Sequence, residues 1–231
     1  MSGRNCEGLM DKLEMMRNWL FFLFVIGISA LNGWSQVPSG QGAFYLDELQ
    51  FGKSKTWFKD QLKKSPEDIA ALIGLGDTYL ALNLADSAKI SFQRAFALDP
   101  KNPYALAGLG KIALLNEDRL AESDYFDRAR RADKMNPDVY CAIAEGCIKL
   151  SRQDTVTALI FLKQGLSINP KYAMLHFSTG NLEICKKNYG LAANAFERAV
   201  FFDPKSATAY RNLGLVYTIS RAYRDALKAL N

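Results

Sequence analysis

Apolar residues return at helical spacing, in short blocks that follow one another closely, through most of the chain. Between Asp68 and Leu82 many of them fall three or four positions apart, and residues 85–98 repeat the pattern. This spacing places the apolar side chains of each block on one face of a helix. The blocks therefore predict pairs of short amphipathic helices. Strand signals are absent from the pattern, so the predicted fold is all-α.

The helix-pair pattern recurs at a regular period along the chain. A dipeptide that ends in Gly or Ala marks each period, at equal steps except for a slightly longer third one: Leu75-Gly76, Leu109-Gly110, Ile143-Ala144, Thr179-Gly180 and Leu213-Gly214. A second marker, a small residue four positions before a large one, follows the same step: Ala88 with Phe92, Ala158 with Leu162, Ala192 with Phe196, and Ala226 with Leu230. Repetition at such a period is the sequence signature of stacked helical repeats.

These markers resemble the tetratricopeptide repeat, whose pattern is W-x2-L-G-x2-Y, then A-x3-F, then P, on a helix-turn-helix unit of about 34 residues. The first unit matches at Leu72, Leu75, Gly76, Tyr79, Ala88, Phe92, Ala95 and Pro100. The resemblance divides the chain into repeats 67–100, 101–134, 135–170 and 171–204 and a truncated fifth repeat, 205–231. It implies a right-handed α-solenoid of helix-turn-helix repeats, with two helices in each of five repeats from residue 67 onward.

The segment 36–66 is expected to contain a linker and then a degenerate half-repeat. Phe58 stands one full period before Phe92, so it keeps the register of the full repeats. Residues 53–64 are predicted to form a helix that covers the start of the first repeat and leaves its lysines in solvent, as a terminal cap of a solenoid requires. The alternative is that these lysines contact anionic lipid headgroups.

The segment 1–35 is predicted to be a signal peptide. Its apolar run, residues 19–31, has 13 residues, which is shorter than the roughly 20 that a membrane-spanning helix needs. Small residues before Gln36 suit cleavage at that position. Because the stretch before the run has no net positive charge, translation is expected to start at Met15 or Met16. The chain is then an exported, periplasmic protein of the bacterial type; the alternative is a membrane anchor formed by residues 19–31.

Composition argues against catalysis, cofactors and metal ions. The net charge of +5 is mild, which disfavours nucleic acid as a partner, and the single His176 removes most metal sites and nucleophile–histidine–acid arrangements. Cys141, Cys147 and Cys185 lack metal-ligand spacing and are interpreted as packed apolar side chains. The G-x-G-x-x-A run at 108–113 falls inside a predicted helix, so it offers no phosphate-binding loop. No catalytic, cofactor or metal residue is predicted, and His176 is expected in the core.

The remaining function is binding of a protein or peptide in the concave groove that the first helices of the repeats form in this family. The predicted groove residues are Ile73, Asp77, Tyr104, Lys111, Glu145, Lys149, Met174, Phe177, Asn181 and Arg211. Tyr104, Met174 and Phe177 are expected to anchor the partner, because other residues supply the packing of their helices. The alternative is that they pack against adjacent first helices.

Charge in the second half of the groove favours an acidic partner segment. Residues 137–231 contain 12 Lys and Arg against 7 Asp and Glu. The predicted function is therefore an exported protein-interaction scaffold. The alternative is a repeat module of a larger protein whose enzymatic or envelope-binding domain follows Asn231, where further repeats or another domain are expected because the fifth repeat is truncated.

Overall fold

The computed structural model describes residues 50–150 and 154–230, and it describes side chains as far as Arg221. These residues form ten helices and no strand. The helices are α3 (Phe51–Lys64), α4 (Ile69–Ala81), α5 (Ala85–Leu98), α6 (Pro103–Leu115), α7 (Arg119–Ala132), α8 (Pro137–Leu150), α9 (Thr155–Ile168), α10 (Ala173–Cys185), α11 (Tyr189–Phe202) and α12 (Ala207–Leu230). The predicted all-helical repeat fold is confirmed.

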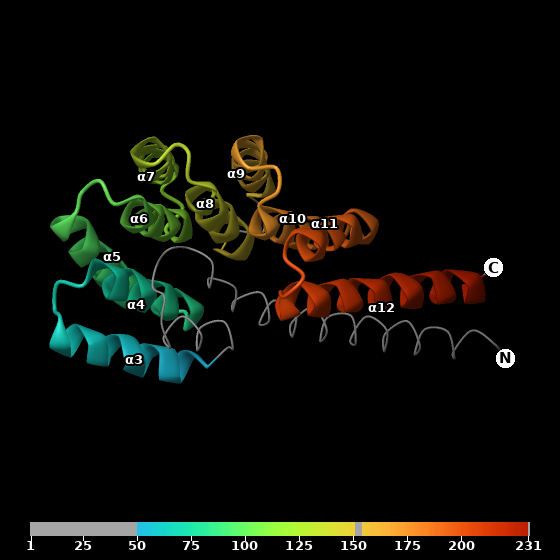
Figure 1. The fold of residues 1–231 in the computed structure, drawn as a ribbon, viewed down its shortest axis with the longest axis horizontal. Helices are drawn as coiled ribbons and strands as arrows, with labels where there is room; N and C mark the ends of the chain where they lie inside the picture. Colours follow the sequence, from blue (N-terminus) through green and yellow to red (C-terminus); the bar gives the residue numbers. More distant parts are fainter. Residues whose placement is uncertain (1–49, 151–153, 231) are drawn as a thin grey trace.

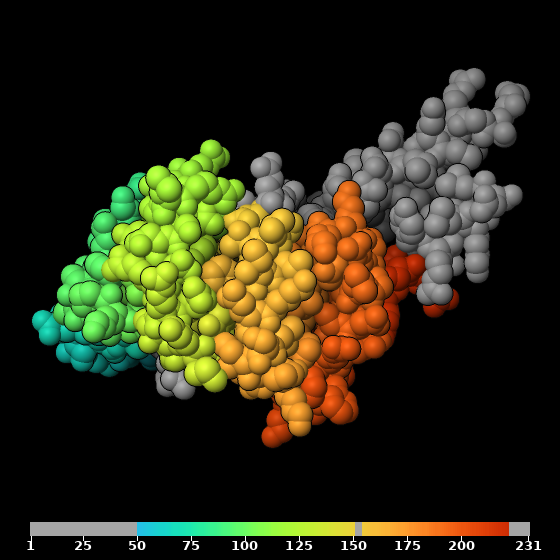
Figure 2. Space-filling view, turned by 90° about the horizontal axis from the view of Figure 1, so that it is seen from above, coloured from blue at the N-terminus to red at the C-terminus, as the bar shows by residue number. Residues whose placement is uncertain are grey.

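The helices pack in consecutive pairs, α4 with α5, α6 with α7, α8 with α9 and α10 with α11, and each pair falls within one predicted repeat. The pairs follow one another along an arch that runs from α3 to α12 (Figure 1). The first helices α4, α6, α8, α10 and α12 follow the inner side of the arch. The outer side shows the second helices as neighbouring ridges (Figure 2).

Polar side chains at the helix starts explain why several helices begin where they do. The Asp68 carboxylate accepts a hydrogen bond from the backbone N–H of Ala71, and Asn102 accepts from the N–H groups of Tyr104 and Ala105 at the start of α6. Asp118 and Asp154 cap α7 and α9 in the same way. Each such cap satisfies a backbone donor that the helix leaves unpaired and contributes about 1 kcal/mol.

Left-handed residues make the turns between paired helices. Asn83, Glu117 and Lys187 have φ angles of 57°, 59° and 61°, and each lies directly between a first helix and its second helix. The corresponding position of the fifth repeat is Arg221, which stays helical within α12. The prediction of two helices in the fifth repeat is therefore wrong, and the structure describes nine helices between residues 69 and 230.

Glycines of the first helices lie directly against aromatic rings of the second helices. A Cβ added at the glycine would come within 2.6 Å or less of a ring atom in three pairs: Gly76 with Phe92, Gly110 with Phe126, and Gly180 with Phe196. Each of these rings is buried. The repeated Gly and Phe markers of the sequence are therefore a close contact between two helices, which explains why they recur together.

Helix α3 confirms the predicted helix at residues 53–64 and begins two residues earlier. Its Phe58 is fully buried against Ala71 and Leu75 of α4, whereas the side chain of Lys63 is 78% exposed. The predicted signal peptide, the cleavage position before Gln36 and the alternative anchor lie outside the described residues. Within the described part, none of the helices combines the length and apolar character needed to cross a bilayer.

Candidate functional site

All ten predicted groove residues lie on the first helices, on α4, α6, α8, α10 and α12. They differ in exposure. The buried ones are Ile73, Lys111, Glu145, Met174, Phe177 and Asn181. Asp77, Tyr104 and Lys149 are partly buried, and Arg211 is exposed. The inner side of the arch is thus a surface with buried polar groups beneath a few accessible side chains.

Asp77 and Lys111 form an ion pair between the first and second repeats. The Lys111 ammonium donates to Oδ1 of Asp77 at 3.1 Å. The Lys111 side chain is 9% exposed and the Asp77 side chain is 15% exposed. The aliphatic stem of Lys111 lies against Gly146 of α8, where an added Cβ would be 2.8 Å from its Cγ. Gly146 therefore leaves room for the lysine that links α6 to α4.

Glu145 is the centre of a second polar cluster, between α8 and α10. It accepts hydrogen bonds from the Ser178 hydroxyl at 3.0 Å and from the Lys149 ammonium at 3.2 Å. The Cys141 sulfur lies 3.3 Å from the Ser178 oxygen. Burial raises the pKa of the Cys141 thiol well above its usual range, with the nearby Glu145 charge acting in the same direction. Cys141 therefore stays a thiol and is not an activated nucleophile.

Three more hydrogen bonds join adjacent repeats: Asn136 to Tyr104 at 3.2 Å, Tyr172 to Asp138, and Asn212 to Asn181 at 3.4 Å. Desolvation raises the pKa of Asp138, against the opposing effect of the Tyr172 hydroxyl. We call the pairs Asp77–Lys111, Glu145–Ser178 and Asn181–Asn212 the inner-face ladder. Its members lie about one repeat apart and join α4 to α6, α8 to α10 and α10 to α12.

Met174 and Phe177 belong to the core as well as to the inner helices. Phe177 is 3% exposed, and its ring centroid lies 5.4 Å from that of Phe196 on α11. The expectation that other residues supply all the packing of α10 is therefore wrong for these two side chains, because both are buried members of the core cluster. Their role as anchors for a partner stays a prediction, and Tyr104 is the more accessible aromatic residue on this side.

The G-x-G-x-x-A run lies inside α6, as the sequence predicts. Both glycines are in contact with rings: an added Cβ would lie 2.3 Å from Phe92 at Gly108 and 2.4 Å from Phe126 at Gly110. They make room for helix packing, and their amides belong to a helix interior. His176 is also placed as predicted, 5% exposed and stacked on Phe202 with a centroid distance of 5.3 Å.

A cluster that the sequence analysis missed joins α7 to the start of α9. A carboxylate oxygen of Glu122, the Cys147 sulfur and a carboxylate oxygen of Asp154 lie within 4.8 Å of one another, and all three residues are buried. The Arg119 guanidinium contacts the Glu122 carboxylate at 2.9 Å and the Asp154 carboxylate at 3.0 Å. Burial raises the pKa of Glu122 and of Cys147. The guanidinium bridges both carboxylates, so the cluster acts as a junction between repeats.

Ser178 and Asn212 are the inner-face residues that the sequence analysis overlooked. Each is buried and pairs with a predicted groove residue of the preceding repeat. The sequence did contain a signal for them, because each is a polar residue within an apolar helix. Each also stands about one repeat after a polar residue of the preceding first helix. Position in a single helix does not reveal such a pair, because the partner lies on a different helix.

Comparisons with known proteins agree with the repeat pattern. A family profile described as Tetratricopeptide repeat matches residues 73–137 and 169–231, more than half of the chain. The chain is 31% identical over 153 residues to anaphase-promoting complex subunit 3 of Schizosaccharomyces pombe, which covers 65% of this chain and 23% of that protein. It is 25% identical over 183 residues to tetratricopeptide repeat protein 6 of Homo sapiens, covering 78% and 35%.

The chain is also 26% identical over 221 residues to protein O-mannosyl-transferase TMTC3 of Homo sapiens, covering 87% of this chain and 24% of that protein. The chain thus spans no more than 35% of the length of each of these relatives.

Two solved structures share the fold. A thermophilic TPR protein of Thermus thermophilus superimposes with a TM-score of 0.57 at 19% identity, over 77% of this chain and 96% of that one. Yeast Tom70 gives a TM-score of 0.55 at 20% identity, over 76% of this chain and 38% of that one. These likenesses support the stacked helix-turn-helix architecture.

Proposed function

The chain belongs to the tetratricopeptide repeat family, and we propose that the inner side of its arch binds a protein or peptide partner without catalysing a reaction. The observation that carries this proposal is the inner-face ladder. It joins α4 to α6 and α8 to α10 and α12, and the Lys111 stem packs on Gly146 between α6 and α8. The accessible side chains of the inner side are therefore positioned before the partner arrives. Such preorganisation lowers the entropy cost of binding.

The partner segment is acidic. Arg211 is exposed on α12, whereas Lys149 of α8 is already paired with Glu145 at 3.2 Å. Asp77 and Glu145, the carboxylates of the ladder, are already paired with cations. An acidic segment therefore meets accessible positive charge on the inner side, which favours its encounter and orientation.

The test is affinity capture of the intact protein from its own cells, after cross-linking, with variants on either side of the arch. Arg211→Glu combined with Tyr104→Ala should lose the captured partner. Lys163→Glu, an exposed residue of the outer helix α9, is the matched control and should retain it. If the outer variant loses the partner while the inner variant retains it, the inner side is not the docking surface.

Export is a second part of the proposal and rests on the apolar run at residues 19–31. A run of this length suits a cleaved secretory signal followed by a periplasmic protein. N-terminal sequencing of the protein from fractionated cells should find Gln36 first. Retention of residues 1–30 in a membrane fraction would support the anchor instead.

The alternative function, a repeat module within a larger protein, is favoured by the relatives, because the chain spans no more than 35% of each of them. In that case, binding by the arch places a separate domain next to its target. The size of the native product, measured by immunoblotting with an antibody against residues 67–204, separates the two functions.

A further inference from the structure

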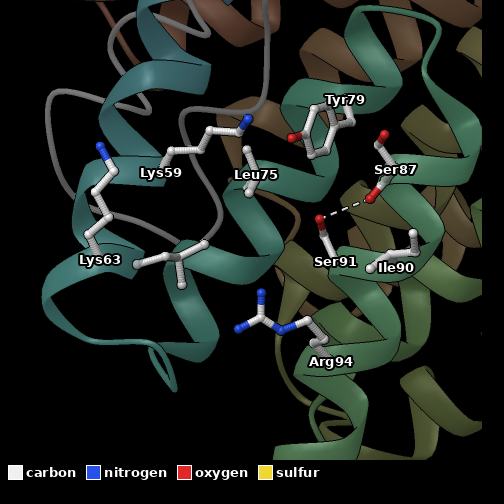
Figure 3. Close-up of a pocket in the computed structure, with 9 residues that line it drawn as sticks. Lys59, Lys63, Leu75, Tyr79, Ser87, Ile90, Ser91 and Arg94 are labelled. Carbon is white, nitrogen blue, oxygen red and sulfur yellow. Dashed lines mark hydrogen bonds between the residues drawn. The ribbon is translucent and has the colours of Figure 1, made fainter.

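A groove between α3 and α5 is a separate feature of the molecule, away from the inner-face ladder. It has a volume of about 430 Å³ and is lined by side chains of α3, α4 and α5. Figure 3 shows Lys59 and Lys63 extending from α3 and Arg94 from α5, with Leu75 and Tyr79 of α4 between them. We call this feature the α3–α5 groove.

The charged side chains that line the α3–α5 groove are all cations. Lys63 pairs with Asp60 at 2.7 Å, and Arg94 donates to the backbone carbonyl of Pro66 at 3.0 Å. Within the described residues, Lys59 and Arg94 form no ion pair. The groove therefore presents positive charge beside an apolar surface that includes Ile90, which is 60% exposed.

The corresponding place one repeat later, between α5 and α7, contains an equivalent arginine, Arg128, with protein groups around it. There the Arg128 guanidinium lies 5.4 Å from the ring centroid of Phe96 and 5.6 Å from that of Tyr125. It also pairs with the Asp124 carboxylate at 3.2 Å. Two rings and a carboxylate thus surround this arginine, and all three belong to the protein itself.

The α3–α5 groove has the same arginine without those three groups. Arg94 stands one full repeat before Arg128, and the positions of Phe96, Asp124 and Tyr125 are taken by Leu62, Ile90 and Ser91. Ser91 is short, and its hydroxyl already donates to the carbonyl of Ser87 at 3.0 Å. The missing rings account for the open volume, and the missing carboxylate accounts for the unbalanced charge.

We propose that the α3–α5 groove binds a peptide segment in which an aromatic side chain is flanked by acidic residues. The aromatic ring takes the place that Tyr125 and Phe96 fill beside Arg128, so that Arg94 lies over its face. A carboxylate next to the ring takes the place of Asp124. Further carboxylates of the segment lie near Lys59 and Lys63. One repeat later the corresponding residues are uncharged, Gln93 and Ala97.

A peptide suits the groove better than a nucleic acid. The apolar side chains that line it, Leu62, Leu75 and Ile90, match a single ring and the aliphatic part of a side chain. The unpaired positive charge does not continue as a stripe onto α7, where Asp124 and Asp127 pair with arginines of that helix. A phosphate backbone requires such a continuous stripe.

Fluorescence anisotropy with a labelled peptide, Gly-Asp-Glu-Tyr-Asp-Glu-Gly, tests the proposal on the intact protein. Binding should weaken as salt concentration rises. Replacing the tyrosine by alanine, or the acidic residues by their amides, should weaken it by about tenfold or more. Arg94→Gln should have a similar effect, whereas Lys89→Ala, which alters an exposed lysine of α5, should leave it unchanged.

A filled variant gives the sharper result. Leu62→Phe, Ile90→Asp and Ser91→Tyr together reproduce the three groups that surround Arg128, so the protein itself occupies the site. This variant should lose peptide binding at least about tenfold without a lower melting temperature, because Arg94 gains the surroundings of Arg128.

Two results would overturn the proposal. One is that the folded filled variant binds the peptide as strongly as the wild type does. The other is that Arg94→Gln binds it as strongly as the wild type does. A single-stranded oligonucleotide that competes with the peptide and is equally sensitive to Arg94→Gln would assign the groove to nucleic acid. Arg211→Glu should not change peptide binding here, which separates this groove from the inner side of the arch.

Discussion

The ring of Phe92 fills the space that a side chain at Gly76 would need, since a Cβ there would lie 2.5 Å from the ring. Gly108, on the first helix of the next repeat, contacts the same ring, with its Cβ position 2.3 Å away. Phe92 is fully buried between them. One aromatic side chain thus joins three helices and two repeats, and the two glycines allow this approach.

Gly76→Ala should destabilise the protein by about 1 to 3 kcal/mol, because the added methyl group would overlap the Phe92 ring. This cost exceeds the gain from the higher helix propensity of alanine. Gly214→Ala is the matched control. Gly214 has the same place in the fifth repeat, is exposed, and has no atom within 4 Å of its Cβ position. That substitution should stabilise α12 by about 0.5 to 1 kcal/mol. Urea unfolding followed by circular dichroism measures both, and equal effects would contradict the contact.

The Asp77–Lys111 pair should show a measurable coupling energy. Asp77→Asn leaves the buried Lys111 ammonium without its counter-charge, whereas Lys111→Met removes the charge and keeps most of the volume. A double-mutant cycle should give a coupling of about 1 to 2 kcal/mol. The exposed pair Asp60 and Lys63 is the control, and its coupling should be much smaller, because solvent screens both charges. Similar coupling in both pairs would show that burial adds nothing.

Acid should weaken the protein through His176. Burial lowers the pKa of this histidine in the folded state, and the hydrogen bond to the carbonyl of Pro170 only partly opposes that effect. The unfolded chain then binds the proton more readily, so this contribution to stability is present above about pH 6.5 and is lost as the pH falls below it.

The control for this effect is His176→Phe, which keeps a ring stacked on Phe202 and cannot take up a proton. Unfolding by urea at pH 7 and pH 5 should show a smaller loss of stability for the variant than for the wild type. Equal losses would assign the acid sensitivity to groups other than His176.

The sequence was sufficient to predict the helix pairs, because their markers are contacts within one repeat. Gly76 and Phe92 meet inside a single helix pair, and the same spacing recurs at Gly110 with Phe126 and at Gly180 with Phe196. The uninterrupted α12 was not predicted. Its sequence carries the same markers, but Arg221 does not adopt the left-handed conformation found at Asn83, and no periodicity encodes that choice.

The inner side was predicted less well than the fold. Helical spacing placed all ten candidate residues on the first helices, but it assigned Phe177 and Met174 to the surface when both are buried against neighbouring helices. It also left Lys111 unpaired. The pairing with Asp77 depends on how two helices lie side by side, and Gly146 of a third helix leaves room for the Lys111 stem. The spacing within one helix reveals neither of these contacts.

The inner-face ladder has a consequence for how the protein folds and yields to force. Its hydrogen bonds join residues between 31 and 34 positions apart in the chain. Each repeat can therefore complete its contacts soon after the next one leaves the ribosome, without waiting for a distant segment. By the same reasoning, a chain pulled from its ends should lengthen in separate steps, each releasing one helix pair, because no contact of the ladder ties the first repeat to the last.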